Sequence, residues 1–405
     1  MAWSGAAGAF RARRGSAGSP TLLQVCGGDL RRAGLPALAP LAEVRHMSSH
    51  ATDRPTAGSV GVVIPCHNYG RFLPTCLDSV LSQPGVNLDV LVIDDASSDD
   101  SRSVAESYAC RDDRVKVISH RVNAGHIATY NEGLATVQGD FLVLLSADDA
   151  LAPRSLVRAA SILAARPNVG FTYGRVQTFS TEIPPPPRMP QLKTTTVWPG
   201  HSWLKRRSQL MTNCVVSPEV VMRRTVYEKA GPYDPALPHT GDLAMWMRAA
   251  AITDVAYLHG PPAAYYRQHT TNMHRHVFRS GTPDGMLLDL AQRRQTLEAV
   301  FASESDDNSR VLMNSGLRTL AAEALSAASR AFTWGFTDEW PVEGLERFAA
   351  ECWPGYRTLP QFRALDRRRK RGAELALRYP PYVATERALE LRRNWVKLRQ
   401  EWTGR

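Results

Sequence analysis

The chain has 405 residues, 43% of them hydrophobic, and a formal net charge of +10. This length and composition indicate a globular protein with one large core or two moderate ones. The charge is uneven, because residues 1–50 carry +4 and residues 361–405 carry +8, which leaves −2 for residues 51–360. Since the body of the chain is not basic, the charge argues against a nucleic-acid-binding protein.

Cysteine spacing and hydropathy narrow the cellular setting. The six cysteines show no CxxC spacing, which argues against a zinc site and a disulfide framework and favours a reduced compartment. No apolar run approaches the roughly 18–20 residues that a membrane span needs. We therefore expect a cytoplasmic protein that meets a membrane only at its inner surface.

The first 56 residues form a segment of their own. Their first 50 residues are rich in Ala, Gly and Arg and nearly free of acids. Such a composition resembles a transit peptide but lacks the apolar centre of a secretory signal. The alternative is a disordered or over-extended start, since Met47 lies shortly before the first expected strand. We expect the second.

From Val60 onward, short apolar runs alternate with helical segments, as in a parallel sheet covered on both faces. We expect strands at 60–65, 88–95, 114–119 and 141–146, and helices at 71–83, 101–109, 127–137 and 153–165. Right-handed crossovers would bring the loops IPCHNYG, DDASSDD and SADDA to the carboxyl edge of the sheet, where ligands bind. The expected fold class is therefore α/β.

Beyond residue 175 the pattern is less regular. Residues 180–200 are rich in proline and are expected to form a loop. We expect strands at 214–224, 255–258 and 263–267, a helix at 242–251, and helices from about 285 to the end.

Two acidic pairs follow expected strands. Asp148 and Asp149 have no neutralising partner nearby in the sequence, and such oxygen ligands suit Mg²⁺ or Mn²⁺ bridging a diphosphate. A helix cap is the alternative, but the acidic loops on neighbouring strands favour the metal. Asp94 and Asp95 are candidates to accept hydrogen bonds from a base or ribose, with turn formation as their alternative. Because IPCHNYG contains neither GxGxxG nor a P-loop, a glycine cradle for phosphate is not expected.

Five segments in this order resemble the inverting family 2 glycosyltransferases of the GT-A fold. They are VVIPCHNYGRFLPTCLDSVLSQ, VLVIDDASSDDS, NAGHIATYNEGL, GDFLVLLSADD and GDLAMWMRAA, and the resemblance extends from about Val60 to His269. It implies a Rossmann-like, mostly parallel sheet with helices on both faces, followed by a helical C-terminal region. The implied domains are 57–284, with a nucleotide-sugar half at 57–175 and an acceptor half at 176–284, and the helical region 285–405.

The resemblance also implies roles for matching positions. Asp242 would be the general base, and Asp148 and His269 would hold Mg²⁺ or Mn²⁺, with Asp149 as a further metal candidate. For His126, helix capping or packing stays open beside contact with the donor phosphates. The implied donor-binding residues are Pro65, Asn68, Tyr69, Asp94, Asp95, His126, Asn131, Ala147 and Asp148.

The chain departs from the family pattern at three positions. Ser146 stands where the first Asp of the DxD metal motif is common, Gly241 where another acid is frequent, and Tyr130 where an Arg is frequent. The first departure puts metal dependence in doubt, and the second leaves Asp242 as the sole candidate base nearby.

The implied activity is sugar transfer from a nucleoside diphosphate sugar, with UDP expected, to an acceptor hydroxyl in polysaccharide, glycolipid or glycosylated-metabolite synthesis. A catalytically weakened nucleotide-sugar-binding relative and a nucleotidyltransferase stay open as alternatives. The basic tail, 361–405, mixes Arg and Lys with Leu, Val and Trp at helical spacing. It would either dock on an anionic membrane near a lipid-linked acceptor or pack on the catalytic domain.

Overall fold

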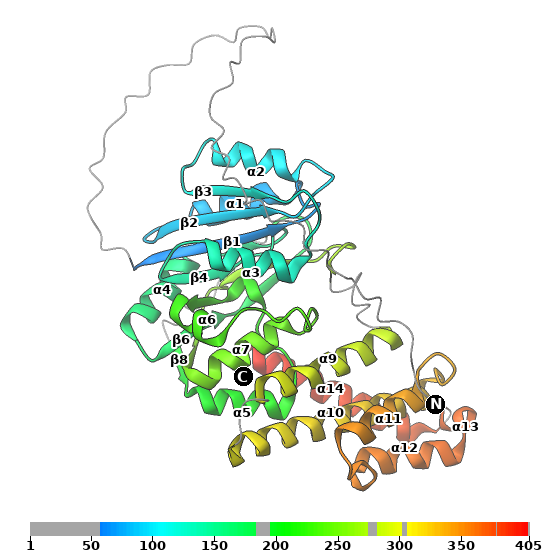
Figure 1. Cartoon of the computed structure of the whole chain (residues 1–405). Coiled ribbons are helices and arrows are strands. Elements are labelled where there is room, and N and C mark those ends of the chain that lie inside the picture. The colour runs from blue at the N-terminus through cyan, green and yellow to red at the C-terminus, as the bar shows by residue number, and fades with distance from the viewer. Residues whose placement is uncertain (1–56, 184–194, 274–281, 302–305, 378, 404–405) are drawn as a thin grey trace, which may run out of the picture.

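The fold is taken from a computed structural model that describes residues 57–183, 195–273, 282–301, 306–377 and 379–403. The expected N-terminal segment 1–56 and most of the proline-rich stretch lie outside these residues. In the described part, a mixed α/β domain is followed by a region made of helices (Figure 1).

The main sheet has eight strands in the order β3-β2-β1-β4-β9-β6-β10-β8. Six of them run in one direction, while β9 and β8 run antiparallel to their neighbours. The expected mostly parallel sheet is therefore confirmed. Its strands are β1 (Ser59–Cys66), β2 (Asn87–Asp94), β3 (Val115–Ser119), β4 (Phe141–Leu144), β6 (Val169–Gly174), β8 (Thr195–Trp198), β9 (Val221–Arg223) and β10 (Asp254–Leu258).

Helices cover both faces of this sheet because its strands are apolar on both sides. Val62 and Ile64 of β1 pack in a core with α1, α2 and α4, whereas Val63 of the same strand packs with α3 and α7. The helices of this domain are α1 (Leu73–Leu81), α2 (Ser101–Ala109), α3 (His126–Thr136), α4 (Ser155–Ala165), α5 (Gly200–Leu210), α6 (Arg224–Ala230) and α7 (Gly241–Ile252).

A small second sheet supports the turn after β4. It has the order β5-β11-β7, in which β11 pairs antiparallel with β5 and parallel with β7. The strands are β5 (Ala150–Leu151), β7 (Val176–Phe179) and β11 (Ala264–Arg267). The sequence pattern did not predict β5, whose two residues are too few to show an alternation.

Three expected elements differ from the structure. The strand expected at 214–224 is confined to Val221–Arg223, because a 3-10 turn at Ser217–Glu219 precedes it and Pro218 cannot donate to a ladder. Part of the expected loop 180–200 forms β8, an edge strand paired with β10. The helix expected from Pro153 begins at Ser155, since Arg154 has a left-handed φ of 63°.

The helical region continues the core of the α/β domain. Helix α9 packs against α7, and α10 packs against α5, so that Leu290 and Leu320 belong to the same core as Trp246. The helices expected from about 285 are confirmed as α9 (Pro283–Phe301), α10 (Asp307–Trp334), α11 (Val342–Cys352), α12 (Pro360–Arg371), α13 (Ala373–Leu377) and α14 (Pro380–Thr403), with a 3-10 turn at Tyr356–Thr358.

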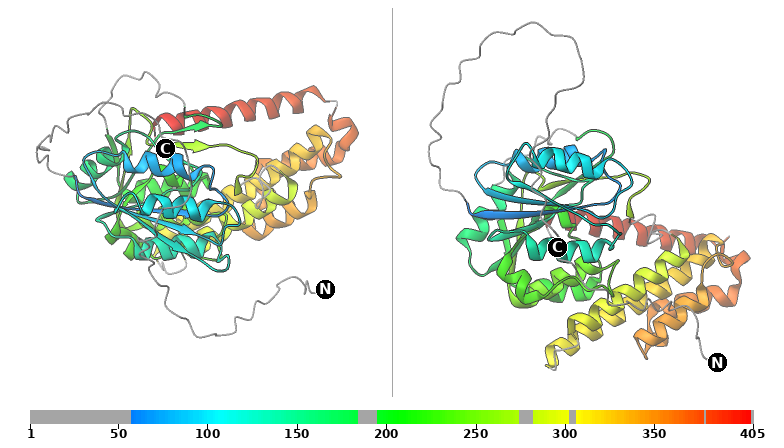
Figure 2. Two further views of the ribbon diagram at one scale, coloured as in Figure 1. Left: turned by 90° about the horizontal axis from the view of Figure 1, so that it is seen from above. Right: turned by 45° about the horizontal axis from the view of Figure 1, so that its top comes forward.

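The last helix runs back from the helical region toward the α/β domain (Figure 2). Near its end, Arg399 lines a cavity together with Trp198 of β8 and Lys205 of α5. Among the described residues, no helix has both the length and the hydropathy that a bilayer crossing requires.

Candidate functional site

Two cavities adjoin at the carboxyl edge of the parallel strands. We name them the donor cavity and the acceptor cavity after the roles that the sequence predicts for their residues. The donor cavity has about 900 Å³ and is lined by the loops that follow β1, β2 and β3. The acceptor cavity has about 600 Å³ and extends to α7, α9 and α10. The two cavities share six lining residues, which are Pro65, Tyr69, His126, Tyr130, Ser146 and Met273.

The loops after β1 and β2 are held together by Asn68. Its backbone is left-handed, with a φ of 59°, a conformation that Asn tolerates better than most residues. Its Oδ1 accepts the Ser98 N–H at 2.8 Å, and its own N–H donates to Ser97 Oγ at 2.9 Å. The structure therefore brings Asn68 to the donor cavity, where it also fixes the shape of the wall.

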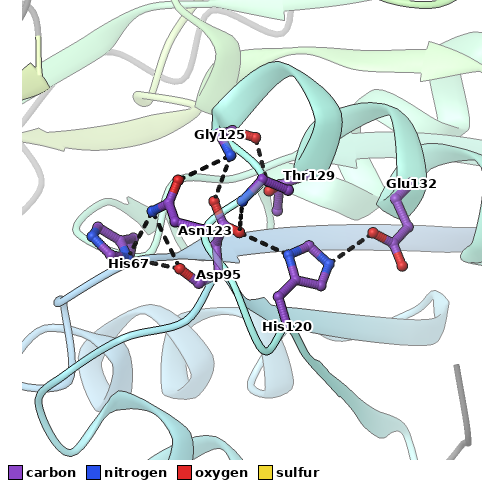
Figure 3. Close-up of polar contacts among 8 residues, drawn as sticks. His67, Asp95, His120, Asn123, Gly125, Thr129 and Glu132 are labelled. Atoms are coloured by element: carbon purple, nitrogen blue, oxygen red, sulfur yellow. Dashed lines mark hydrogen bonds and ion pairs between the residues drawn. The ribbon is translucent and has the colours of Figure 1, made fainter. Parts of the chain in front are cut away.

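Asp95 organises the floor of the donor cavity (Figure 3). Its Oδ1 accepts hydrogen bonds from Ala124 N–H at 2.7 Å and from His120 Nδ1 at 2.7 Å, and its Oδ2 accepts one from Gly125 N–H at 3.0 Å. Burial alone would raise the pKa of Asp95, but these hydrogen bonds outweigh burial and lower it. Asp95 thus fixes the turn that leads into α3 as an ionised carboxylate.

His120 joins two carboxylates. Its Nε2 lies 2.8 Å from Glu132 Oε2, on the opposite side of the ring from Asp95 (Figure 3). Burial alone would lower the pKa of His120, but its hydrogen bonds to Asp95 and Glu132 outweigh burial and raise it. The imidazole of His120 therefore connects Asp95, just after β2, to Glu132 of α3.

Asp94 is buried and does not line either cavity. Its Oδ1 is buried without a hydrogen-bond partner among the described residues. Of the acidic pair that the sequence assigned to the donor, the structure brings only Asp95 to the cavity surface.

The Asp148 and Asp149 turn is anchored by β11. The Arg267 N–H donates to Asp149 Oδ1 at 2.9 Å, and Arg267 Nε donates to the Asp148 carbonyl at 2.9 Å. Burial, followed by the nearby charge of Asp148, raises the pKa of Asp149 well above its usual range. Asp149, the further metal candidate from the sequence, thus has a structural partner in the backbone of Arg267.

Asp148 and His269 meet beside the acceptor cavity. Asp148 Oδ2 lies 2.9 Å from His269 Nε2, and His269 Nδ1 lies 2.8 Å from the Thr271 hydroxyl. Two aromatic rings hold the imidazole, Tyr69 edge-on at 5.6 Å and Phe72 at 4.9 Å between ring centroids. The pair expected from the sequence is therefore in direct contact.

The residues at this point fit a divalent cation in part. Asp148 Oδ1 is buried and has no hydrogen-bond partner in the described ranges, so it is available as a ligand. One carboxylate and one imidazole leave positions that phosphate oxygens and water would fill, as is usual for Mg²⁺ or Mn²⁺. In the part of the chain that the structure describes, no three His, Cys, Asp or Glu side chains are grouped to hold a metal by themselves.

Asp242 lies in the first turn of α7 and lines the acceptor cavity. Ser217 donates to its Oδ2 at 2.7 Å, and the Tyr233 side chain also hydrogen-bonds to it. Burial raises the pKa of Asp242, and the bonds from Ser217 and Tyr233 offset part of that rise. A carboxylate of this kind accepts a proton more readily than an exposed Asp does.

Three other predicted donor residues have protein contacts instead. The side-chain amide of Asn131 makes two hydrogen bonds with the backbone of Tyr233, both at 2.8 Å. Ala147 is fully buried. Neither residue lines the donor or the acceptor cavity. His126 Nε2 lies 3.0 Å from the Pro238 carbonyl and lines both cavities. The packing alternative for His126 thus has a partner in the structure.

The sequence did not point to several residues that shape the site. Ser217 and Tyr233 contact Asp242 from distant loops, and His120 and Arg267 support the acidic turns. These residues carry no motif of their own. The single available signal was their nearness to segments with a motif, as for His120 just before NAGH.

Comparison with known proteins identifies the domain that carries the donor cavity. Residues 61–230 match the model of the family described as glycosyl transferase family 2. The chain carries a glycosyl transferase family 2 domain. The match covers less than half of the chain and ends before Asp242 and the helical region.

Relatives of the family 2 domain support the assignment. An uncharacterized glycosyltransferase of Nostoc sp. is 27% identical over 228 residues, which are 53% of this chain and 66% of the relative. The putative glycosyltransferase EpsH of Bacillus subtilis is 34% identical over 95 residues, 24% of this chain and 27% of EpsH. The alignments thus span less than two thirds of each relative.

Solved structures show a weaker likeness. The mannosyltransferase PcManGT of Pyrobaculum calidifontis, solved with GDP-Man and Mn²⁺, is 16% identical, with 87% of this chain and 90% of that chain covered and a TM-score of 0.45. TarS 1-349 of S. aureus, solved with UDP-GlcNAc, is 14% identical, with 73% and 92% covered and a TM-score of 0.44. At TM-scores below 0.5, neither structure supports an argument about this chain.

Proposed function

We propose that the chain transfers a sugar from a nucleoside diphosphate sugar, with UDP as its nucleotide, to an acceptor hydroxyl with inversion. One observation carries the proposal: Asp242, a carboxylate whose pKa is raised by burial and which hydrogen-bonds Ser217 and Tyr233, lines a cavity that shares a wall with the cavity of the family 2 domain. Donor and acceptor would meet at this wall, which includes Tyr130 and Ser146.

The chemistry is a single displacement. The acceptor oxygen attacks the anomeric carbon from the face opposite the diphosphate, and the bond from that carbon to the diphosphate oxygen breaks with its electron pair. Asp242 takes the proton of the acceptor hydroxyl. Ser217 and Tyr233 orient the carboxylate, and burial makes it a stronger base than an exposed Asp.

Asp148 and His269 would hold a divalent cation next to the diphosphate. The cation would supply positive charge where negative charge develops on the leaving group. Around it, Asn272 adds to the fixed geometry, since its Nδ2 lies 3.5 Å from Asp148 Oδ2 and donates to the Arg267 carbonyl at 3.0 Å. The protein would thereby position Asp148 before the donor binds.

A screen of donors tests the proposal. The full chain is incubated with UDP-, GDP- and dTDP-sugars and Mn²⁺, and thermal unfolding and product release are followed. We expect a UDP-sugar to raise the melting temperature and to be hydrolysed slowly to UDP and free sugar. Release of pyrophosphate from UTP and a sugar 1-phosphate, in a parallel assay without a UDP-sugar, would indicate a nucleotidyltransferase. Binding of the UDP-sugar without turnover would indicate a catalytically weakened relative.

We also propose that α14 contacts an anionic membrane surface near the acceptor. Leu391 and Trp395 of this helix are 70% and 61% exposed, and the segment 361–405 carries +8. Exposed apolar side chains on a basic helix are typical of surface binding to anionic lipid. Sedimentation with phosphatidylserine vesicles should fall when Leu391 and Trp395 are both changed to Ser, and equal sedimentation would reject the contact.

A further inference from the structure

A cluster of four polar residues lines the acceptor cavity and lies outside the segment 61–230 that matches family 2. The acceptor cluster, as we call it, consists of His239, Asp289, Arg293 and Glu323. His239 precedes α7, Asp289 and Arg293 lie on α9, and Glu323 lies on α10. Nothing in the chemistry proposed for Asp242 requires these side chains.

The cluster is held together by its arginine. Arg293 Nη1 and Nη2 donate to Glu323 at 2.9 and 3.0 Å, and Nη2 also lies 2.7 Å from Asp289 Oδ2. Nη1 donates to the Met211 carbonyl as well, and His239 Nε2 lies 3.0 Å from Asp289 Oδ1. Such a network holds the two carboxylates in fixed positions.

The acidic side chains of the cluster are more exposed than its basic ones. The side chains of Arg293 and His239 are only 7% and 6% exposed, whereas those of Asp289 and Glu323 are 37% and 39% exposed. An ion pair that served only to join α9 to α10 would have no need of carboxylates open to a cavity. A carboxylate retains acceptor positions beyond those that its protein partners fill.

The buried arginine adds a second observation. Its Nε lacks a hydrogen-bond partner within the described residues, although it is buried and Arg293 lines the cavity. An unmatched buried N–H is costly unless a ligand or water satisfies it. The cluster therefore offers a donor besides its carboxylate acceptors.

The charge of the cavity restricts what it can bind. Its lining includes the carboxyl groups of five residues against one guanidinium, that of Arg293; the five are Asp148, Asp149, Asp242, Asp289 and Glu323. Within the acceptor cluster, the two carboxylates outnumber the guanidinium, so a phosphate or carboxylate on the acceptor would be repelled there. A hydroxyl suits both the carboxylates and an N–H donor, since it can donate and accept.

Aromatic rings provide the remaining wall. Tyr69, Tyr130, Tyr233 and Tyr266 all line the same cavity. Ring faces offer apolar surface, and a few placed polar groups then fix the orientation of a ligand. This combination suits the apolar faces and peripheral hydroxyls of a sugar ring.

We propose that the acceptor cluster binds the hydroxyl groups of an uncharged sugar on the acceptor, and that the helical region thereby selects the acceptor. The proposal rests on the proposed function, because it assumes that the acceptor enters the cavity of Asp242. Asp289 and Glu323 act as binding residues, and Arg293 and His239 position them.

The test compares uncharged and anionic probes on the full chain with saturating donor and Mn²⁺. The uncharged probes are methyl glycosides of glucose, galactose and mannose, and the anionic probe is methyl glucuronide. We expect at least one uncharged probe to raise nucleoside diphosphate release above donor hydrolysis, and the glucuronide to leave it unchanged. The proposal would be overturned if the glucuronide raised nucleoside diphosphate release, or if none of the uncharged probes did.

Variants then test the residues. Glu323→Gln should raise the KM for the stimulating probe about tenfold or more, since a hydrogen bond to a charged group is lost. Glu298→Gln is the control. Glu298 also pairs with an arginine, Arg294 of its own helix α9, at 2.8 Å, but it does not line the cavity. An equal KM in Glu323→Gln and the wild type would contradict the proposal.

Two readouts separate this proposal from other causes. A purely structural role for Glu323 would lower the melting temperature and leave the KM for the probe unchanged, and Asp289→Asn repeats the test where Glu323→Gln fails to fold. Absence of donor hydrolysis in the wild type with every nucleotide would instead reject the proposed function itself.

Discussion

The donor and acceptor cavities are built in different ways. Most of the donor cavity comes from loops that follow three neighbouring parallel strands, and its walls are fixed by hydrogen bonds to backbone, such as those from Ala124 and Gly125 to Asp95. The acceptor cavity gathers side chains from the 3-10 turn before β9, from α7 and from the helical region. The edge of the parallel sheet is therefore combined with a second wall that comes from α7 and the helical region.

The cavities also differ in how charge is placed. On the donor side, Asp95 is surrounded by hydrogen-bond donors, and its pKa is lowered. On the acceptor side, Asp242 is buried with two donors, and its pKa is raised. We infer that carboxylates of the donor side maintain shape while Asp242 moves a proton, and changes to each side should separate these roles.

The largest effect is expected from removing the proposed base. Asp242→Asn should lower kcat by about 10²–10⁴, the typical contribution of general-base catalysis, and should leave the affinity for the UDP-sugar unchanged. Steady-state rates and calorimetric donor binding measure the two quantities. A rate within twofold of the wild type would remove Asp242 from this role.

Loss of the proposed cation site at Asp148 should lower the rate nearly as much. Asp148→Ala and EDTA should each lower the rate by about 10²-fold or more, because a bound cation contributes several kcal/mol to the transition state. Asp100→Ala serves as a control at an exposed carboxylate of the donor cavity. Full activity in EDTA would show that Ser146, in place of the usual acid, accompanies a metal-independent reaction.

The packing under the donor cavity predicts a loss of stability. A Cβ on Gly133 of α3 would lie 2.2 Å from Val63 Cγ1 on β1, so the helix and strand would have to separate. Gly133→Val should lower the free energy of unfolding by about 1–3 kcal/mol, as overpacking does. Urea unfolding measures this loss of stability. Gly344→Val is the control, because a Cβ on Gly344 would meet its nearest neighbour, Leu287 Cδ1, at 3.4 Å.

The link through His120 predicts a pH dependence of stability. The pKa of His120 in the folded protein is raised above its unfolded value of about 6.5. Its contribution to the free energy of unfolding is therefore complete below about pH 6.5 and is lost as the pH rises through the folded pKa. The stability difference between the wild type and His120→Gln should therefore shrink from acid to alkaline pH in urea unfolding. A difference that grows with pH would contradict the assignment, and His201→Gln, at an exposed histidine, is the control.

The smallest effect is expected at a hydrogen bond to the base. Ser217→Ala removes a donor that lowers the pKa of Asp242, so that pKa should rise further. Since the base acts when deprotonated, the acid limb of the profile of kcat against pH should move to higher pH. An unmoved acid limb in this variant would exclude Ser217 as a partner of the base.

Local patterns predicted the donor side well because each of its parts lies within one short segment. The apolar runs predicted β1 to β4, and the acidic residues at the ends of β2 and β4 were visible in DDASSDD and SADDA. The pattern could not distinguish Asp94, which faces the interior, from Asp95, which faces the cavity. That difference depends on which side chain meets the turn at Ala124 and Gly125.

The acceptor side was predicted less completely because its contacts join distant segments. Asp242 was found through its family segment, but its partner Ser217 comes from a segment that was expected to be a strand. Arg293 and Glu323 are ordinary residues of a helical pattern until α9 and α10 pack beside α7 and α5. Long-range packing of this kind leaves no mark in local periodicity.

The most direct measurement is the configuration of the sugar that the enzyme first releases from an α-linked UDP-sugar in water, followed by proton NMR. If Asp242 activates the attacking oxygen on the face opposite the diphosphate, the β-anomer appears first and the α-anomer grows in only by mutarotation. Initial release of the α-anomer would contradict the single displacement and the role of Asp242.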